Sequence, residues 1–216
     1  MAPELPRSFP DRDWFCRPSL EVAPDLLGAI LTSVIALQTV RLRITEVEAY
    51  DGAHDPGSHA YRGLTPRNAS MFGEAGRLYV YRSMGIHWCC NIVCGPVGQA
   101  TAVLLRAGEV IEGTEHALER RLATGVCASD RELARGPGRL TQALGIKGDD
   151  DGADLLGLGP GFSLTLPPEP ATDFHTGPRV GVSGEGGRGD LYPWRFWLPG
   201  EPTVSTYRPG KPRKKL

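Results

Sequence analysis

The stretch EVEAY (46–50) places two carboxylates and a tyrosine at alternate positions. It continues VRLRIT (40–45), whose apolar and polar residues alternate as in a half-buried β-strand. If the alternation persists, both glutamates and the tyrosine share the apolar face, which then opens into a pocket where a carboxylate can act as a general base. A β-bulge near Thr45 would instead reset the alternation, turning Val47 inward and both glutamates to solvent. The pattern alone leaves both interpretations open.

Glu46 and Glu48, two residues apart on one strand, would lie about 6.5–7 Å from each other. This is at the lower end of the range for the two carboxyl groups of inverting glycoside hydrolases, so a sugar glycoside hydrolase using Glu46 and Glu48 is one interpretation. Two acids on one strand would, however, approach a substrate from the same side, whereas that mechanism places them on either side of the bond. A single glutamate that activates water is the simpler interpretation.

Two polar residues interrupt strand patterns that are otherwise apolar. Arg106 closes TAVLLR (101–106) and falls on the same face as Leu104. A buried arginine needs an anionic partner, and a glutamate is a suitable one. Asn91 interrupts CCNIV in the same way. Each of these residues, taken alone, is more often a structural hydrogen-bonding group than a site residue.

The segment RLYVYRSMGIHWCCNIV (77–93) predicts a β-hairpin that turns at Ser83-Met84-Gly85, where the glycine supplies a positive φ. Its tip carries the large apolar side chains Met84 and Ile86 next to Arg82. Hairpin tips are usually polar. An apolar tip beside a cation has the composition of a wedge that enters the minor groove of DNA. A tip that packs beneath a neighbouring loop is the alternative.

The composition is that of an ordinary globular protein, with 23% charged and 40% hydrophobic residues and a net charge of −1. The charge is unevenly distributed, because between residues 60 and 91 a single acid, Glu74, accompanies four arginines: Arg62, Arg67, Arg77 and Arg82. This distribution favours a local anionic partner over general coating of a polyanion. For any one arginine, a solvated surface position is the alternative.

The five cysteines form no CxxC pair, which predicts a reduced, cytosolic protein with cysteines that fill the core. His87 lies near Cys89, Cys90 and Cys94, but this spacing matches no usual zinc-ligand pattern, so we expect no metal. We recognise no signal peptide, and the longest apolar run (26–37) is too short to cross a membrane.

Strands must position most of these residues. The patterns predict them at 29–37, 40–50, in the hairpin and at 101–106, 162–167, 179–183 and 195–199, with helices at 19–28, 66–73, 114–125, 130–133 and 138–145. The predicted fold class is α+β: one domain on a curved, mostly antiparallel β-sheet with peripheral helices and a protruding β-hairpin. We expect an N-terminal lead-in at 1–17, the domain at 18–200 and a basic C-terminal tail at 201–216.

Together these features resemble the alkyladenine (3-methyladenine) DNA glycosylase family, of the human alkyladenine glycosylase type. The blocks that carry the resemblance follow in order over about residues 18–200. They are EVEAYDGAHDPGSHAYRGLTPRN (46–68), MFGEAGRLYVYRSMGIHWCCNIV (71–93), VLLRAGEV (103–110), GPGRLTQALGI (136–146), PRVGVS (178–183) and PWRF (193–196). The first two blocks together are highly specific, and they favour the pocket over the solvent-facing glutamates.

The resemblance implies roles for individual residues. Glu48 matches a general base that activates water, and Arg106 matches a residue that helps to hold this water. Asn91 matches a residue whose bulk discourages guanine. The pocket that sandwiches a flipped base matches three aromatic residues: Tyr50, His59 and Tyr81.

On this resemblance the hairpin enters the DNA. The wedge position falls on Met84, where the human-type enzyme has a tyrosine, and Ile86 and His87 also depart from the human pattern. Methionine can separate base steps but lacks aromatic stacking. The candidates for gripping the flanking phosphates are Arg67, Arg77 and Arg82.

The implied activity is that of a monofunctional DNA glycosylase. It would flip alkylated or deaminated purines, such as 3-methyladenine, hypoxanthine and ethenoadenine, and release them with an activated water, leaving an abasic site. The expected partner is double-stranded DNA with damaged purines, with no cofactor, metal or membrane, and with a monomeric protein. It would act in the cytoplasm, at the nucleoid, of a bacterium or in the nucleus of a eukaryote. The alternatives are a non-catalytic protein that binds damaged DNA and the sugar glycoside hydrolase.

Overall fold

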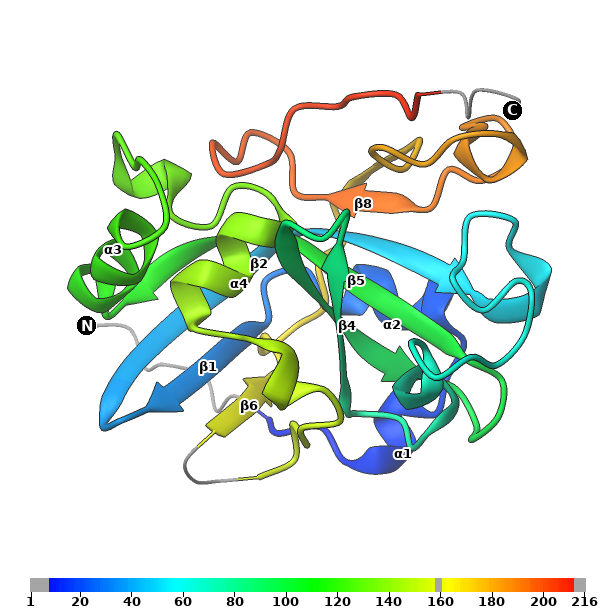
Figure 1. Cartoon of the computed structure of the whole chain (residues 1–216), viewed down its shortest axis with the longest axis horizontal. Coiled ribbons are helices and arrows are strands. Elements are labelled where there is room, and N and C mark those ends of the chain that lie inside the picture. The colour runs from blue at the N-terminus through cyan, green and yellow to red at the C-terminus, as the bar shows by residue number, and fades with distance from the viewer. Residues whose placement is uncertain (1–7, 158–160, 212–216) are drawn as a thin grey trace.

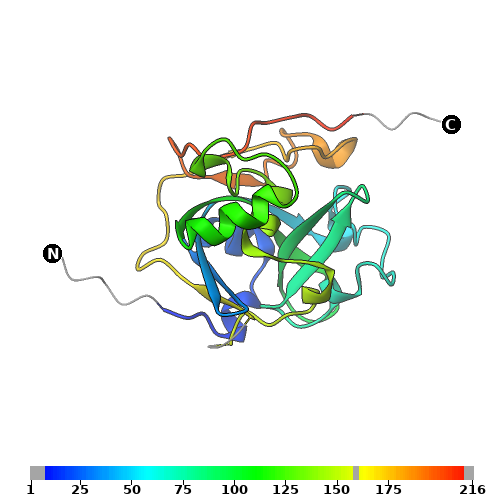
Figure 2. The same cartoon turned by 60° about the vertical axis from the view of Figure 1, so that its left-hand side comes forward.

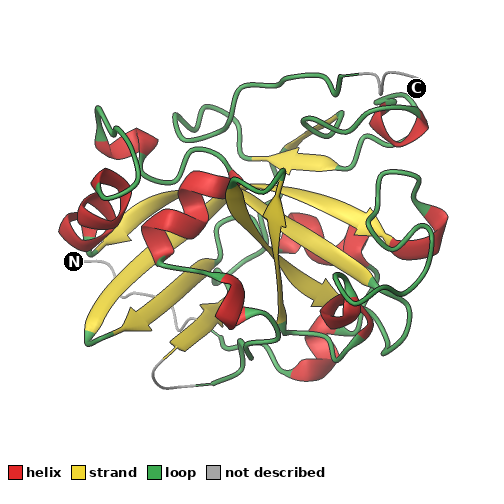
Figure 3. Ribbon diagram, in the orientation of Figure 1, coloured by secondary structure: helices red, strands yellow, loops and turns green. Residues whose placement is uncertain are grey.

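The structure, a computed structural model, describes residues 8–157 and 161–211. An antiparallel sheet of eight strands forms its centre, with the helices at the periphery (Figures 1 and 3). Six strands follow the order β3-β4-β5-β2-β1-β6, and β8 pairs with both β2 and β7. Their bounds are β1 Ile30–Ile35, β2 Gln38–Asp51, β3 Leu78–Ser83, β4 His87–Cys94, β5 Thr101–Glu112, β6 Gly161–Thr165, β7 His175–Gly177 and β8 Arg195–Trp197. The predicted α+β fold with a mostly antiparallel sheet is confirmed.

Four α-helices pack around the sheet. Figure 2 shows α3 across one side of the strands with α4 beside it. Their bounds are α1 Arg12–Phe15, α2 Ser19–Asp25, α3 Thr114–Leu122 and α4 Pro137–Leu144. Short 3₁₀ turns complete the described chain: η1 Gly52–His54, η2 Ala69–Phe72, η3 Asp130–Glu132, η4 Gly148–Asp150 and η5 Glu185–Gly187. None of the helices that the structure describes is long and apolar enough to span a bilayer.

The two faces of the central strands differ in character. One face builds the main hydrophobic core with the helices, through residues such as Leu78, Ile92 and Leu105. The opposite face carries polar and aromatic side chains. Residues that pair directly across neighbouring strands point to the same face, so the pairing shows which side chains lie together there. One such row runs from β3 to β2 through Tyr79, Asn91, Leu104 and Glu48.

A β-bulge at Thr45 decides which residues of β2 reach each face. Ile44 pairs with Gly108 and Glu46 with Ala107, so Thr45 is the extra residue. Before the bulge the core receives even-numbered residues such as Val40, Leu42 and Ile44, and after it the core receives Val47 and Ala49. The bulge, one of the two interpretations of this stretch, is therefore present, and the uninterrupted alternation of the other interpretation is wrong.

The bulge does not send the glutamates into solvent, as that interpretation required. Glu46 and Glu48 are fully buried, although they lie on the face opposite the core. Strand β8 lies beside β2 in the sheet, where Glu46 pairs with Trp197 and Glu48 with Arg195, and the backbone N–H groups of Val180 and Ser205 bind the two carboxylates. The result is a buried polar layer between β2 and the C-terminal part of the chain.

Three predicted elements are corrected, and one of them, the helix predicted at 130–133, is only the 3₁₀ turn η3. The strand predicted at 179–183 is absent from the described residues, because Pro178 lacks an N–H to pair and Gly181 adopts a left-handed φ of 75°. A strand forms just before it instead, as β7. The helix predicted at 66–73 is reduced to the 3₁₀ turn η2.

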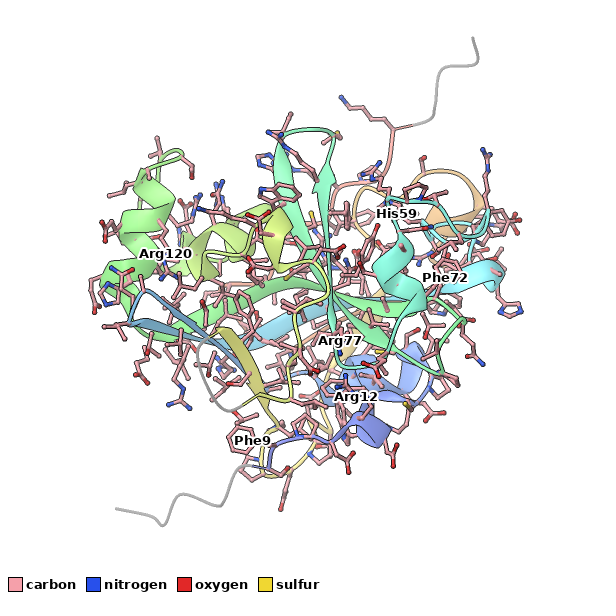
Figure 4. The ribbon with its side chains drawn as sticks, turned by 60° about the horizontal axis from the view of Figure 1, so that its bottom comes forward. Phe9, Arg12, His59, Phe72, Arg77 and Arg120 are labelled. Carbon is pink, nitrogen blue, oxygen red and sulfur yellow. The ribbon has the colours of Figure 1, made fainter. Side chains whose placement is uncertain are left out.

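The hairpin of β3 and β4 forms as predicted, with its turn at Met84 and Gly85. Both residues have left-handed φ values, 48° and 69°, and the Ile86 N–H donates to the Ser83 carbonyl at 2.9 Å. Met84 is 84% exposed and Ile86 is 65% exposed, so the alternative in which the tip packs beneath a loop is wrong. The hairpin projects from the molecule at the top of Figure 4.

Segments on both sides of the expected domain pack against it. Phe15 is part of the main core, and Thr203 is buried with its hydroxyl 2.9 Å from that of Thr45. The expected division into 1–17, 18–200 and 201–216 stays a prediction. Its outermost parts, 1–7 and 212–216, lie outside the described residues.

Candidate active site

Glu48 is the centre of the polar layer, and both of its carboxylate oxygens are engaged. The Val180 N–H donates to Oε1 at 2.6 Å, and Arg106 Nη1 approaches the same oxygen at 3.4 Å. The Tyr50 hydroxyl donates to Oε2 at 2.9 Å. A carboxylate offers about four acceptor sites, two on each oxygen. The free site therefore belongs to Oε2, on the side of Tyr50.

Arg106 holds its charge between the two glutamates. Its Nε donates to Glu46 Oε1 at 3.0 Å, and only 7% of its side chain is exposed. Burial opposes the charged form, but Glu48 and Glu46 together raise the pKa of Arg106 above its usual value. The predicted pairing of Arg106 with a glutamate is confirmed, and it involves both acids.

Glu46 differs from Glu48 because four hydrogen bonds, from two guanidinium groups and from Ser205, hold its carboxylate. Besides Arg106, its Oε1 accepts from Arg195 Nε at 2.7 Å and from the Ser205 hydroxyl at 2.9 Å. Its Oε2 accepts from the Ser205 N–H at 2.6 Å. A carboxylate held in this way is not available as a second catalytic acid, which counts against the sugar glycoside hydrolase.

Arg179 is a buried cation beneath Tyr50. Its guanidinium Nη2 donates to Asp55 Oδ1 at 2.6 Å, its Nη1 donates to the Ala49 carbonyl at 3.0 Å, and its Cζ lies 4.5 Å from the centre of the Tyr50 ring. Burial, and then the charge of Glu48, raise the pKa of Tyr50 well above its usual value. The Tyr50 hydroxyl therefore stays protonated and donates to Glu48.

An aromatic cluster lies beside this network. The His59 and Tyr81 rings meet edge to face with centroids 4.5 Å apart, and Tyr79 stacks on Tyr81 at 5.4 Å. His59 Nδ1 is 3.1 Å from the Tyr79 hydroxyl, and its carbonyl accepts from the Asn68 side chain at 3.0 Å, which fixes the loop. Burial, and then Arg67, lower the pKa of His59. The imidazole is therefore neutral at pH 7.

Asn91 stands in the same cross-strand row as Glu48. It is 4% exposed, and its side-chain amide donates to the Tyr79 carbonyl at 3.0 Å. The structure thus brings together the predicted base-binding residues on β3 and β4, and it gives Asn91 a fixed orientation.

The three predicted phosphate-binding arginines occupy different surroundings. Arg67 donates to the Arg82 carbonyl at 2.9 Å and lies over the Tyr81 ring, so both residues are near the hairpin. Arg77 instead pairs with Glu74 at 2.7 Å and approaches Asp154. Figure 4 shows Arg77 beside Arg12, at the end of β3 that is remote from the hairpin turn. Among the residues that the structure describes, no group of three or more potential metal ligands occurs.

Sequence reasoning missed four contributors to this site. They are the Val180 N–H, Arg179, Arg195 and Ser205. The Val180 N–H is free to bind Glu48 because the strand predicted at 179–183 does not form. A signal existed for Arg179 and Arg195, because each adjoins apolar residues in RVGV and RFW, as Arg106 does in TAVLLR. Nothing in the sequence around Ser205 indicates its bond to Glu46.

Known proteins with similar sequences point to one family. The family model described as methylpurine-DNA glycosylase matches residues 13–202. A relative from Leifsonia xyli subsp. xyli is 55% identical over 210 residues, covering 96% of this chain and 97% of the relative. Relatives from Streptomyces avermitilis and Burkholderia lata are 52% and 47% identical, each covering 94% of both chains. Each of the three bears the provisional name 3-methyladenine DNA glycosylase.

Proposed function

This chain belongs to the methylpurine-DNA glycosylase family, enzymes that hydrolyse N-glycosyl bonds, and we propose that it removes 3-methyladenine, hypoxanthine and ethenoadenine from duplex DNA. The observation that carries this proposal is the buried carboxylate of Glu48 with one free acceptor site beside an aromatic cluster. The protein would act as a monomer at the nucleoid.

The target nucleotide must leave the base stack before its glycosidic bond can be reached, at a cost of a few kcal/mol. The exposed tip of the hairpin supports Met84 as the wedge that fills the vacated space, with Ile86 beside it. Arg67 and Arg82 would bind phosphates near the hairpin. For Arg77 this role has less support, because carboxylates already neutralise it.

The extruded base would be held by Tyr50, His59 and Tyr81, with base–aromatic stacking worth roughly 1–3 kcal/mol. A neutral His59 suits this role, because it does not repel a cationic alkylated purine. Asn91, fixed by the Tyr79 carbonyl, would crowd the exocyclic amine of guanine. A cationic base gains further from electron-rich rings.

Glu48 would act as the general base. Water bound at the free site of Oε2 attacks the anomeric carbon of the sugar, the bond from that carbon to the purine nitrogen breaks, and the purine leaves with the bonding electrons. The proton of the water passes to Glu48. Arg106, whose Nη1 lies 3.4 Å from Oε1, would orient the carboxylate and so help to hold this water. Neither Lys147 nor Lys211, the lysines of the described chain, contacts this network, which supports hydrolysis without strand cleavage.

The test is base release by the Glu48→Gln variant under single-turnover conditions. Duplexes carrying 3-methyladenine, hypoxanthine or ethenoadenine are incubated with excess protein, and alkali then reveals the abasic sites. We expect the wild type to give cleavage and Glu48→Gln to give none while still binding lesion DNA. Retained release by this variant would overturn the general-base role. Binding by the wild type without release would indicate the non-catalytic damage-binding protein.

A further inference from the structure

An open cavity of about 310 Å³ lies immediately beside Glu48. Two of its lining residues, Arg106 and Val180, are the ones that contact Glu48 Oε1. The remaining lining residues come from the start of α4 and from the C-terminal segment: Arg135, Arg139, Ser205, Thr206 and Arg208. A cavity of this volume has ample room for a phosphate group.

The lining carries an excess of positive charge. Glu46 and Glu48 are balanced by Arg106 and Arg195, which leaves the charges of Arg135, Arg139 and Arg208. Within residues 8–157 and 161–211, no ion pair involves any of these three, and no carboxylate lines the cavity. Clustered cations in a concave, partly desolvated setting concentrate a field that attracts anions.

The backbone around these arginines is held in place. Arg135 Nε donates to the Val204 carbonyl at 3.0 Å, and the Arg208 carbonyl accepts from the Gly181 N–H at 2.8 Å. Glu46 fixes Ser205 through two hydrogen bonds. The cavity wall is therefore anchored, through Ser205 and Glu46, to the strand that carries Glu48.

We propose that this cavity binds a phosphodiester group of the DNA backbone next to the flipped nucleotide, through Arg135, Arg139 and Arg208. The inference rests on the proposed function. In a nucleotide, one sugar separates the phosphate from the glycosidic bond, so a cavity adjoining Glu48 is where that phosphate must lie when the bond meets the carboxylate. The planar guanidinium groups suit phosphate oxygens. The hairpin arginines would then serve phosphates further along the duplex.

The experiment measures the dissociation constant for a hypoxanthine duplex as a function of salt. Arg135→Gln, Arg208→Gln and the double variant are compared with the wild type and with Arg41→Gln, a control arginine that pairs with Glu112. We expect the cavity variants to bind several-fold more weakly. The slope of log affinity against log salt should fall by about 0.9 for each phosphate that a variant no longer neutralises. The control should match the wild type.

A second arm locates the phosphate. Duplexes carrying one uncharged methylphosphonate, placed on either side of the lesion in turn, should weaken wild-type binding at one of these positions. The double variant should bind this methylphosphonate duplex as tightly as it binds the unmodified one. The uncharged group and the two substitutions would remove the same arginine–phosphate interaction. Losses that simply add, or cavity variants that bind like Arg41→Gln, would overturn the proposal.

A third arm separates the DNA backbone from a free anion. Sodium phosphate, at matched ionic strength with chloride, should compete with DNA for the wild type more than for the double variant. If phosphate raises the thermal midpoint of the wild type while the double variant binds DNA normally, the cavity belongs to a free ion and the proposal fails. Absence of base release by the wild type would instead refute the proposed function, without affecting these binding measurements.

Discussion

Glu46 and Glu48 are two residues apart on β2 and equally buried, yet their hydrogen bonds assign them different tasks. Glu48 keeps a free acceptor site next to the aromatic cluster. The Glu46 carboxylate accepts hydrogen bonds from Arg106, Arg195 and Ser205. The partners that surround each acid, rather than its burial, distinguish the proposed general base from the residue that positions it.

The Glu46→Gln substitution should therefore act mainly on stability. It leaves two buried guanidinium groups without their shared carboxylate, and breaking a buried ion pair costs about 3–5 kcal/mol. We expect its free energy of unfolding, measured by urea denaturation, to fall by about that amount. Glu48→Gln is the comparison: it removes one partner of Arg106, which keeps Glu46, so we expect a smaller loss of stability together with the loss of base release. Equal urea midpoints for the two variants would contradict the positioning role of Glu46.

At the scale of an element, the hairpin of β3 and β4 combines a strained turn with an exposed apolar tip. Met84 has a left-handed φ of 48°, which is unfavourable for a non-glycine residue, and its side chain makes no compensating burial at 84% exposure. Strain of this kind at an exposed position is typical of a functional site. Asparagine tolerates this conformation better, since Asn-Gly is the preferred pair in such turns.

The Met84→Asn substitution should separate the turn from the wedge. We expect the free energy of unfolding to rise by on the order of 1 kcal/mol as the turn strain is relieved. Binding to a lesion duplex should weaken more than binding to a plain duplex, because the wedge is lost. Met84→Ala is the control, because it should weaken binding to the lesion duplex in the same way without raising the free energy of unfolding. The fluorescence of 2-aminopurine beside the lesion reports extrusion. Equal losses on both duplexes would show that Met84 is no wedge.

At the scale of the whole molecule, the C-terminal third of the chain closes the polar face of the sheet. Arg179 connects the C-terminal third to the sheet, since it binds Asp55 in the loop after β2 and the Gly186 carbonyl in the C-terminal region. It also stacks against Tyr50 and Trp194. This fully buried cation therefore links the loop after β2, which carries His59, to the C-terminal layer that binds Glu48.

The Arg179→Met substitution should destabilise the whole fold. The uncompensated Asp55 carboxylate is fully buried, so we expect the free energy of unfolding to fall by about 3–5 kcal/mol. Arg188→Gln is the matched control, because its ion pair with Asp190 is exposed and such pairs contribute about 0–1 kcal/mol. Urea denaturation of both variants checks this. A loss for Arg179→Met no larger than that for Arg188→Gln would contradict the linking role.

The sequence predicts most of the strands and the hairpin, because alternating patterns such as VRLRIT and LYVY report which residues face the main core. Arg106 and Asn91 interrupt such patterns and so become candidates, whereas only the family resemblance separates Glu48 from Glu46. The sequence pattern allows a bulge at Thr45 but cannot show whether it forms, since a register shift depends on the partner strand β5. The roles of Glu46 and Ser205 depend on a hydrogen bond between residues 159 positions apart. No local pattern encodes an interaction of that kind.

The bulge at Thr45 also has a consequence for how such a chain can vary over evolution. Because one extra residue turns Glu48 away from the core, the number of residues in β2 is itself part of the candidate active site. A single-residue deletion between Ile44 and Glu48 would keep every proposed catalytic side chain and still exchange the two faces of the strand. Single substitutions along β2 can therefore accumulate during evolution, whereas an insertion or deletion of one residue there would disrupt the site at once.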